Sequence, residues 1–219
     1  MGQRIHQRGE VDSHPRPGHR GTGPLNPITW FHEDRKRART ERDPCAELCA
    51  LATVNADGAP EIRTLVLRDL EDPANPTEGT RLAVFINDSS PKWSAMARVS
   101  ALAYFPVLKV QYRLSCATAP VPGALVHGRW QDRPEAPKRM DWYYARRPQS
   151  SPVASRSQLI EEVGELNLPQ PLVAPPSARG LYLLPFAIER LDLNQPDGIH
   201  DRRRWHRPDT GWRETVLVP

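Results

Sequence analysis

Short apolar segments separated by turn residues fill the middle of the chain, and they limit the possible folds more than any other feature. Residues 48–54 are mostly apolar, residues 55–60 carry Asn, Gly and Pro, and residues 62–67 are rich in β-branched residues and leucine. Two apolar segments joined by such a turn predict a β-hairpin. Residues 80–88 predict a third strand, reached through a surface loop that contains Pro and Gly.

Further strand segments follow as far as the C-terminus. They are expected at residues 101–107, 108–121, 123–130, 181–193 and 211–219. Short strands with turns between them are typical of an antiparallel barrel, and a parallel sheet with crossover helices would need a different pattern. We therefore predict a mainly β fold in which residues 48–130 supply most of the barrel and residues 183–218 close it.

Helical segments are expected around this barrel. The first begins at Pro27, a residue that suits the first position of a helix, and continues through a charged stretch. Others are expected at residues 89–100, 136–148 and 155–166. Pro148 is expected to end the helix that precedes it, because a proline disfavours helical backbone in the residue before it.

The N-terminal segment differs in composition from the rest. Residues 1–24 are rich in Gly, Pro, Arg and His and almost without apolar side chains, so they predict a disordered tail before a domain spanning residues 25–219. This segment lacks the apolar centre of a signal peptide, and no window holds the roughly 18 apolar residues that span a membrane. We expect a cytoplasmic protein without a membrane partner.

Charge and cysteine content narrow the partners further. The chain has 30 Lys and Arg against 26 Asp and Glu, a net charge of +4, with the acidic residues interspersed throughout. This mild excess favours, weakly, a partner that carries phosphate groups. The three cysteines are an odd number, so a disulfide framework is not expected.

Common catalytic and cofactor motifs are missing from the sequence. It contains no P-loop, no glycine-rich dinucleotide motif and no nucleophile elbow of the α/β-hydrolases. The histidines share no ligand spacing with a cysteine or a carboxylate, so no metal site is expected. The chain must hold any phosphate in another way.

Two stretches offer phosphate-binding groups. In "RTLVLR", residues 63–68, the period of a strand places Arg63 and Arg68 on opposite faces, where each can reach a different ligand group. In "INDSSPKW", residues 86–93, a strand end runs into a helix start that combines serine hydroxyls, free backbone N–H groups and Lys92. The alternative for the second stretch is an ordinary helix cap with a solvated lysine.

From about Pro27 to Pro219 the chain resembles the pyridoxamine 5′-phosphate oxidases and their relatives among the FMN-binding split-barrel proteins. The segments that carry the resemblance occur in the family's order: "NPITWF", "ALATVNADGAPEIRTLVLR", "VFINDSSPKW", "VQYRL", "YYARRPQSS" and "IHDRRRWHRPDTGWRETVLVP". The resemblance implies an FMN-dependent oxidoreductase that oxidises a small phosphorylated amine or alcohol with the flavin as hydride acceptor. It also implies a homodimer with FMN at the interface and a place in pyridoxal phosphate biosynthesis.

The resemblance also implies which residues form the site. The flavin would be bound by Arg63, Thr64, Val66, Leu67, Arg68, Ile86, Asn87, Ser90, Lys92, Gln111 and Arg202. The phosphate of the substrate would be held by Arg68, Tyr143, Arg147 and Ser151, and its reacting ring would lie against His200. His200 and Arg202 are the expected catalytic residues, because a cation near the electron-accepting edge of the ring stabilises the reduced, anionic flavin.

Several positions depart from the family's pattern. Gly198 stands where these oxidases carry an arginine poised against the substrate, Leu191 replaces a tryptophan near the flavin, and Pro91 replaces an arginine near the phosphate. A Gln-Ser pair of the family is only loosely matched by "SRSQ" at residues 155–158. These departures leave the substrate open.

Two other classes of protein remain open on the sequence. One is a split-barrel protein that binds flavin without turnover. The other is a nucleic-acid-binding module that uses the basic run Arg202, Arg203, Arg204, Trp205 and Arg207. The second lacks any recognised nucleic-acid-binding motif and mixes acidic residues through its surface, so no nucleic-acid partner is expected.

Overall fold

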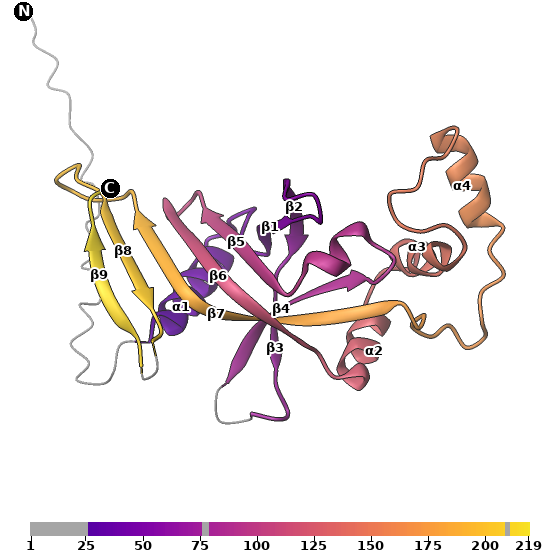
Figure 1. The fold of residues 1–219 in the computed structure, drawn as a ribbon, viewed down its shortest axis with the longest axis horizontal. Coiled ribbons are helices and arrows are strands. Elements are labelled where there is room, and N and C mark those ends of the chain that lie inside the picture. The colour runs from indigo at the N-terminus through magenta and orange to yellow at the C-terminus, as the bar shows by residue number, and fades with distance from the viewer. Residues whose placement is uncertain (1–25, 76–78, 209–210) are drawn as a thin grey trace, which may run out of the picture.

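The computed structural model describes residues 26–75, 79–208 and 211–219. The predicted N-terminal tail lies outside the described residues. Within these ranges the chain forms a nine-stranded antiparallel sheet that curves into a half-barrel (Figure 1). The strands are β1 (Leu48–Val54), β2 (Pro60–Val66), β3 (Arg68–Glu71), β4 (Thr80–Asn87), β5 (Arg98–Phe105), β6 (Val110–Pro120), β7 (Ala178–Asp192), β8 (Asp201–His206) and β9 (Arg213–Leu217).

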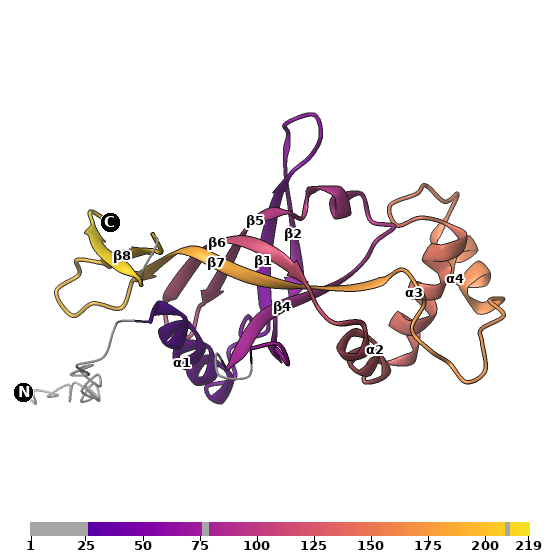
Figure 2. The same ribbon diagram turned by 60° about the horizontal axis from the view of Figure 1, so that its bottom comes forward.

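Neighbouring strands follow the order β2-β1-β5-β6-β7-β4-β3, with β8 paired to β7 and β9 paired to β8. The helices are α1 (Pro27–Thr40), the short 3₁₀ helix η2 (Pro91–Ala95), α2 (Gly123–Gln131), α3 (Glu135–Arg146) and α4 (Arg156–Gly164). Strands β8 and β9 lie at one end of the molecule, and α3 and α4 lie at the other (Figures 1 and 2). No described helix is long and apolar enough to cross a membrane.

The long strand β7 joins these two ends. Its residues 178–183 pair with β4, its residues 187–192 pair with β8, and β6 runs along its other edge. A Cβ atom at Gly180 would lie 2.9 Å from the Cβ of Val121 and 3.0 Å from the ring of Phe85. Only glycine therefore allows β7 to pass this closely over its neighbours.

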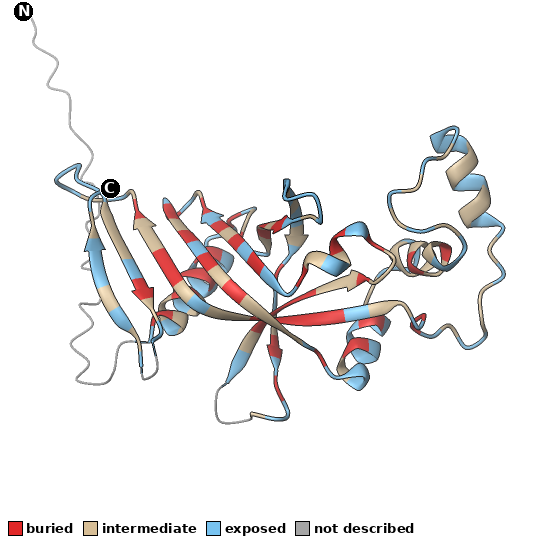
Figure 3. Cartoon of the chain, viewed as in Figure 1, coloured by how far each residue is buried: buried red, intermediate tan, exposed pale blue. Residues whose placement is uncertain are grey.

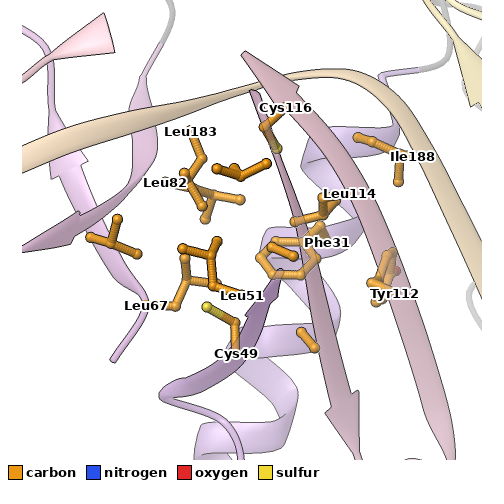
Figure 4. Close-up of a cluster of buried hydrophobic side chains, with 14 of the residues drawn as sticks. Phe31, Cys49, Leu51, Leu67, Leu82, Tyr112, Leu114, Cys116, Leu183 and Ile188 are labelled. Carbon is orange, nitrogen blue, oxygen red and sulfur yellow. The ribbon is translucent and has the colours of Figure 1, made fainter. Parts of the chain in front are cut away.

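Helix α1 covers one face of the sheet and closes the main core. Its first turn is capped by the side chain of Asn26, which accepts a hydrogen bond of 3.1 Å from the backbone N–H of Ile28. Phe31 is fully buried, and its ring centroid lies 5.0 Å from that of Tyr112 and 6.1 Å from that of Phe105 (Figure 4). Alternate residues of the strands point into this core, as the banded burial pattern shows (Figure 3). The main core therefore joins apolar residues of α1 with inward-facing residues of the strands.

Several predictions from the sequence are confirmed. The antiparallel fold, the hairpin of β1 and β2, the strand at residues 80–88, the helix that begins at Pro27 and the helices that correspond to α3 and α4 are all present. The three cysteines are free thiols.

The strand predicted at residues 123–130 is wrong, because this segment forms α2. Val126 and Trp130, four residues apart, are both buried on one side of that helix, and Val126 packs in a small core with Tyr182 of β7. An apolar segment this short fits either a strand or a helix on composition alone. Strands β1 to β6 therefore supply most of the barrel and end at Pro120.

The helix predicted at residues 89–100 is also wrong over most of its length. Only the single 3₁₀ turn η2 forms, and β5 already begins at Arg98. The reason is burial: Val99, Ala101, Ala103 and Phe105 alternate into the core, and this period belongs to a strand. The sequence also missed β3, which continues from β2 after Leu67 but pairs with β4 instead of β1.

Candidate functional site

A cleft opens between the hairpin strand β2 and the helices α2 and α3. Its volume is about 730 Å³, a size that suits a cofactor or a small ligand. Strand residues form one side, and helix residues that include Trp130, Arg133 and Asp141 form the other. Of the residues predicted to bind the flavin, the lining contains Thr64, Val66, Arg68 and Ile86.

Burial alternates along β2 and into the start of β3. Thr64, Val66 and Arg68 are exposed, whereas Arg63 is half-buried and does not line the cleft, which agrees with the prediction that the two arginines face opposite sides. Because β2 is an edge strand, paired only with β1, its outer backbone N–H and C=O groups have no strand partner. A flat polar ring can bind such an edge through backbone groups.

Leu67 lies below the cleft and not in its lining. Its side chain is fully buried, its N–H donates to the carbonyl of Glu47 at 2.9 Å, and its carbonyl accepts from the guanidinium of Arg35. The predicted role of the Leu67 backbone against the flavin ring therefore competes with two existing hydrogen bonds. Val66, by contrast, lines the cleft and pairs with Leu48 of β1.

Arg35 of α1 holds this part of the strand in place, and sequence reasoning did not single it out. The side chain is fully buried and donates to the carbonyl of Ala46 at 2.8 Å, to Asp69 at 2.7 Å and to Glu47 at 2.9 Å, besides Leu67. Its only signal in the sequence is one basic residue among several in a charged helix. The contacts that distinguish it come from residues 11 to 34 positions away.

Asp69 is the acidic partner of this arginine at the cleft wall. Burial alone raises the pKa of its carboxyl, but a hydrogen bond from His32 and the charges of Arg35 and Arg39 outweigh burial and hold the pKa well below its usual range. Asp69 is therefore ionised at neutral pH. The charges of Asp69 and Arg68, neighbours at the start of β3, give this edge of the cleft both signs.

Beside the cleft strand, Lys92, Ser90 and Arg63 form a cluster that we call the cationic seat. The Lys92 amine is buried and donates to the hydroxyl of Ser90 at 2.6 Å. Burial, and next the charge of Arg63, lower the pKa of Lys92. Two cations held close together, with the pKa of one depressed, are a favourable position for an anion.

The geometry of this seat argues against one of the alternatives raised by the sequence, an ordinary helix cap with a solvated lysine. Lys92 is not a solvated lysine, and the Ser90 side chain makes no capping hydrogen bond. Because η2 has only five residues, its N-terminus adds little, and the side chains carry the seat. Arg63 also donates to Thr53 at 2.7 Å and pairs with Glu61 at 2.7 Å, which fixes its guanidinium.

Asn87, another predicted flavin ligand, is buried at the end of β4. Its amide donates to the hydroxyl of Ser177 at 2.9 Å and to the carbonyl of Asp141 at 3.5 Å, and its carbonyl accepts from the N–H of Ser89 at 3.0 Å. The side chain thus connects β4 to α3. Its neighbour Ile86 lines the cleft.

The residues predicted to hold the substrate phosphate lie in different parts of the structure. Arg68 lines the cleft, whereas Tyr143 and Arg147 turn toward Glu162 of α4, and Ser151 lies in the loop after α3. The cleft that contains Arg68 is lined by neither Tyr143 nor Arg147, whose side chains contact Glu162 instead. The sequence did not single out Glu162.

Gln111 and Arg202, also predicted to bind the flavin, lie in register with each other across β6, β7 and β8. Gln111 pairs with Leu191, and Leu191 pairs with Arg202, so the three share the sheet face opposite the core. Gln111 is half-buried, and its amide makes no hydrogen bond to another described side chain. His200 is exposed just before β8, and Gly198 lies in the preceding turn with a φ of +75°.

The basic run around Arg202 is not a free cationic surface. Arg202 and Arg204 both contact Glu189, whereas Arg203 points to the other face and pairs with Asp201 and Glu214. Trp205 is 1% exposed and belongs to the core. Arg202 and Arg204 thus share one face of β8, Arg203 and Trp205 share the other, and each of these three arginines contacts at least one acid.

Gln111, His200 and Arg202 are therefore separated from the cleft and the cationic seat within one chain. Gln111 lies on β6, His200 lies just before β8 and Arg202 lies on β8, the strand at the end of the molecule opposite α3 and α4 (Figures 1 and 2). A single chain brings the first group of predicted flavin ligands together and leaves the second group on another exposed face.

Comparison with known proteins gives the same fold. No family model matches the chain. A structure of PhzG from Burkholderia lata in complex with tetrahydrophenazine-1-carboxylic acid superposes with a TM-score of 0.74 at 23% identity, covering 90% of this chain and 95% of that one. A pyridoxamine 5′-phosphate oxidase-related, FMN-binding protein from Nostoc punctiforme superposes with a TM-score of 0.70 at 20% identity, covering 90% of this chain and 100% of that one. The chain therefore has the fold of the split-barrel structures.

Sequence relatives give the family among proteins of this fold. Pyridoxine/pyridoxamine 5′-phosphate oxidase from Ectopseudomonas mendocina is 30% identical over 206 residues, covering 90% of each chain. The enzyme of the same name from Chromohalobacter salexigens is 28% identical over 207 residues, covering 90% of this chain and 91% of that one. The chain belongs to the pyridoxamine 5′-phosphate oxidase-like family of FMN-binding split-barrel proteins.

Proposed function

We propose that this protein is an FMN-dependent oxidoreductase that oxidises a small amine or alcohol and works as a homodimer with two equivalent flavin sites. The observation that carries the proposal is the cationic seat of Arg63, Ser90 and Lys92 beside an edge strand that lines a cleft. A flavin mononucleotide needs both parts: cationic donors for its phosphate and a partly apolar cleft for its ring.

The residues present fit this cofactor. Arg63, Ser90 and Lys92 would hold the phosphate, because the buried Lys92 amine donates within the described residues to the Ser90 hydroxyl alone and lies near a second cation. The Val66 backbone and the Ile86 side chain, both in the lining, would bind the ring. When bound, FMN supplies the acceptor for a hydride from an amine or alcohol carbon and returns the electrons to an oxidant.

The chain's own residues provide positioning and charge around that chemistry. Arg35 holds the segment from Leu67 to Asp69 in place at the cleft through its buried hydrogen bonds. Arg202 would supply positive charge at the flavin ring, which lowers the energy of the reduced form. His200 would contact the substrate and hold it against the ring.

The homodimer follows from the separation of the two groups of residues. Gln111 and Arg202 share the sheet face opposite the core, away from the cationic seat, and the resemblance assigns both to the flavin, so a second copy would bring them to it. An isologous dimer would complete two sites at once, because each copy would lend its Gln111, His200 and Arg202 to the other.

Purification of the protein as expressed tests this proposal. We expect a yellow protein with a flavin spectrum, a dimer mass by light scattering, and bleaching of the flavin under anaerobic conditions by at least one amine or alcohol in a screen. The screen should include pyridoxine and pyridoxamine 5′-phosphates and their unphosphorylated forms. A colourless protein, or a monomer that binds FMN, would contradict the proposal, and a yellow dimer that no substrate reduces would indicate a flavin-binding role without turnover.

A further inference from the structure

Helix α4 places a carboxylate between the two side chains that were expected to receive a phosphate. The hydroxyl of Tyr143 donates to Oε2 of Glu162, and the guanidinium of Arg147 lies 3.5 Å from Oε1 of the same carboxylate. Tyr143 is 3% exposed, so its hydroxyl has little access to other partners. The two donors converge on one anion, and that anion belongs to the protein.

We propose that Glu162 fills the anion-binding position formed by Tyr143 and Arg147, and that the natural substrate of this protein is therefore an amine or alcohol without a phosphate group. The inference rests on the proposed oxidoreductase function and specifies its substrate class. It replaces the expectation from the sequence that the substrate is phosphorylated.

The charges around Glu162 explain why a phosphate group would be excluded from the position formed by Tyr143 and Arg147. The hydrogen bond from Tyr143 and the charge of Arg147 lower the pKa of Glu162, so its carboxylate is ionised at neutral pH. Arg147 and Glu162 together carry no net charge, whereas the cationic seat keeps a net positive charge from Lys92 after Arg63 has paired with Glu61. A phosphate dianion placed here would also lie directly against a like charge, an arrangement that binding sites use to reject a ligand.

The two donors of this position, Tyr143 and Arg147, already donate hydrogen bonds within the protein. A tyrosine hydroxyl has one proton to donate, and Tyr143 gives it to Glu162. Arg147 uses another nitrogen to donate to the carbonyl of Pro152 at 2.9 Å. A phosphate would have to displace Glu162 before either residue could bind it.

Contacts independent of Tyr143 and Arg147 hold Glu162 where it is. Gln158, one turn earlier on α4, donates to the carboxylate of Glu162 at 2.8 Å, and the Ser155 side chain caps the helix by accepting from the N–H of Gln158. Arg139 of α3 donates to the carbonyls of Val163 and Gly164 at 3.2 and 2.9 Å. Helix α4 is thus fixed on α3 at its end as well as through the carboxylate.

The test compares ligands with and without the phosphate on the FMN-loaded dimer. Isothermal titration calorimetry with pyridoxamine 5′-phosphate and with pyridoxamine gives the affinity contributed by the phosphate. For the wild type we expect no preference for the phosphorylated ligand. Glu162→Gln keeps the hydrogen-bond acceptor for Tyr143 but removes the charge, and we expect it to raise the affinity for pyridoxamine 5′-phosphate at least about tenfold while leaving that for pyridoxamine unchanged.

Glu161→Gln is the matched control, because it removes the same charge from the neighbouring exposed position of α4. We expect it to behave as the wild type, and melting temperatures establish that both variants are folded. A wild type that prefers the phosphorylated ligand tenfold, or a Glu162→Gln variant that gains no preference, overturns the inference. A colourless protein would instead contradict the proposed flavin function, and the titration of Glu162→Gln would still decide the question of the phosphate.

Discussion

Arg202 and Glu189 face each other across β8 and β7, with Nε and Nη2 of the arginine 3.0 and 2.9 Å from Oε1 of the carboxylate. Glu189 is buried and also receives Arg204 at 3.2 Å and Arg113 at 3.3 Å. Burial raises the pKa of Glu189, but the hydrogen bonds from Arg202 and Arg204 and the charge of Arg113 lower it by more. The carboxylate therefore stays ionised and holds Arg202 on the exposed face of the sheet, within an excess of positive charge.

This arrangement predicts that substitutions of Arg202 and of its neighbour Arg203 affect the rate of flavin reduction differently. We expect Arg202→Ala to slow anaerobic flavin reduction by the best substrate of the screen about a hundredfold, by analogy with the loss of an electrostatic donor at a reacting group. Arg203 points to the other face, toward Asp201 and Glu214, so Arg203→Ala should change the rate by no more than about twofold. Stopped-flow absorbance measures both, and equal losses would indicate a generic basic surface.

The cationic seat predicts which residues set the affinity for FMN. Lys92→Ala and Arg63→Ala should each weaken FMN binding by about 1.5–3 kcal/mol, the range for a hydrogen bond to a charged group. Lys36→Ala removes a lysine from an exposed position of α1 and serves as the control. Fluorescence titration of the apoprotein with FMN measures the three variants. Unchanged affinity in both seat variants would mean that the cofactor binds elsewhere.

The pH dependence of FMN binding should follow Lys92. Burial and the charge of Arg63 lower the pKa of Lys92 from its ordinary value of 10.5. Only the protonated amine attracts the phosphate by charge, so the affinity should fall as the pH rises through this lowered pKa, beginning below pH 10.5. In Lys92→Arg the side chain stays charged, and the alkaline loss should disappear. Titrations of both proteins between neutral and alkaline pH would reveal an identical decline if another group were responsible.

Arg35 should be the most important arginine of α1 for stability. Its side chain is fully buried with ion pairs to Asp69 and Glu47, so Arg35→Ala leaves buried acceptors and charge without a partner. We expect a loss of about 3–5 kcal/mol in the free energy of unfolding. Arg37, on the same helix, is 56% exposed, and Arg37→Ala should cost less than about 1 kcal/mol. Urea denaturation followed by circular dichroism compares the two, and similar losses would refute the assigned role.

Gly198 gives a prediction about pyridoxine 5′-phosphate. Wild-type turnover should lie well below about 1 s⁻¹, an ordinary enzyme rate. An added Cβ at Gly198 meets no atom within 4 Å, but the φ of +75° makes any side chain there strained by about 1 kcal/mol. Because Glu162 also fills the phosphate position, we expect Gly198→Arg to raise turnover only in combination with Glu162→Gln.

Oxygen uptake with the single and double variants measures this effect. Gly198→Asn, which tolerates the same backbone conformation, controls for the strain. Wild-type turnover at 1 s⁻¹ or faster would refute the argument from Gly198, although it would agree with the family.

Local pattern was sufficient for most of the fold. The hairpin of β1 and β2, the start of α1 at Pro27 and the alternation of Arg63 and Arg68 depend on turn residues, capping and the period of two, which are properties of neighbouring residues. The errors at η2 and α2 arose in short apolar segments, where burial against distant strands decides between helix and strand.

The residues of the candidate site divide in the same way, into those that the local sequence indicates and those that only contacts between distant elements define. The sequence alone determined the family and the residues of the cationic seat, because Arg63 and Lys92 lie in recognisable stretches of the chain. Only the tertiary structure decided that Arg35 supports the cleft wall, that Gln111 and Arg202 lie on another face, and that Glu162 meets Tyr143 and Arg147. Each of these relationships joins side chains through space from separate elements, and the energy of burying or pairing a charge depends on that neighbourhood and not on the order of residues.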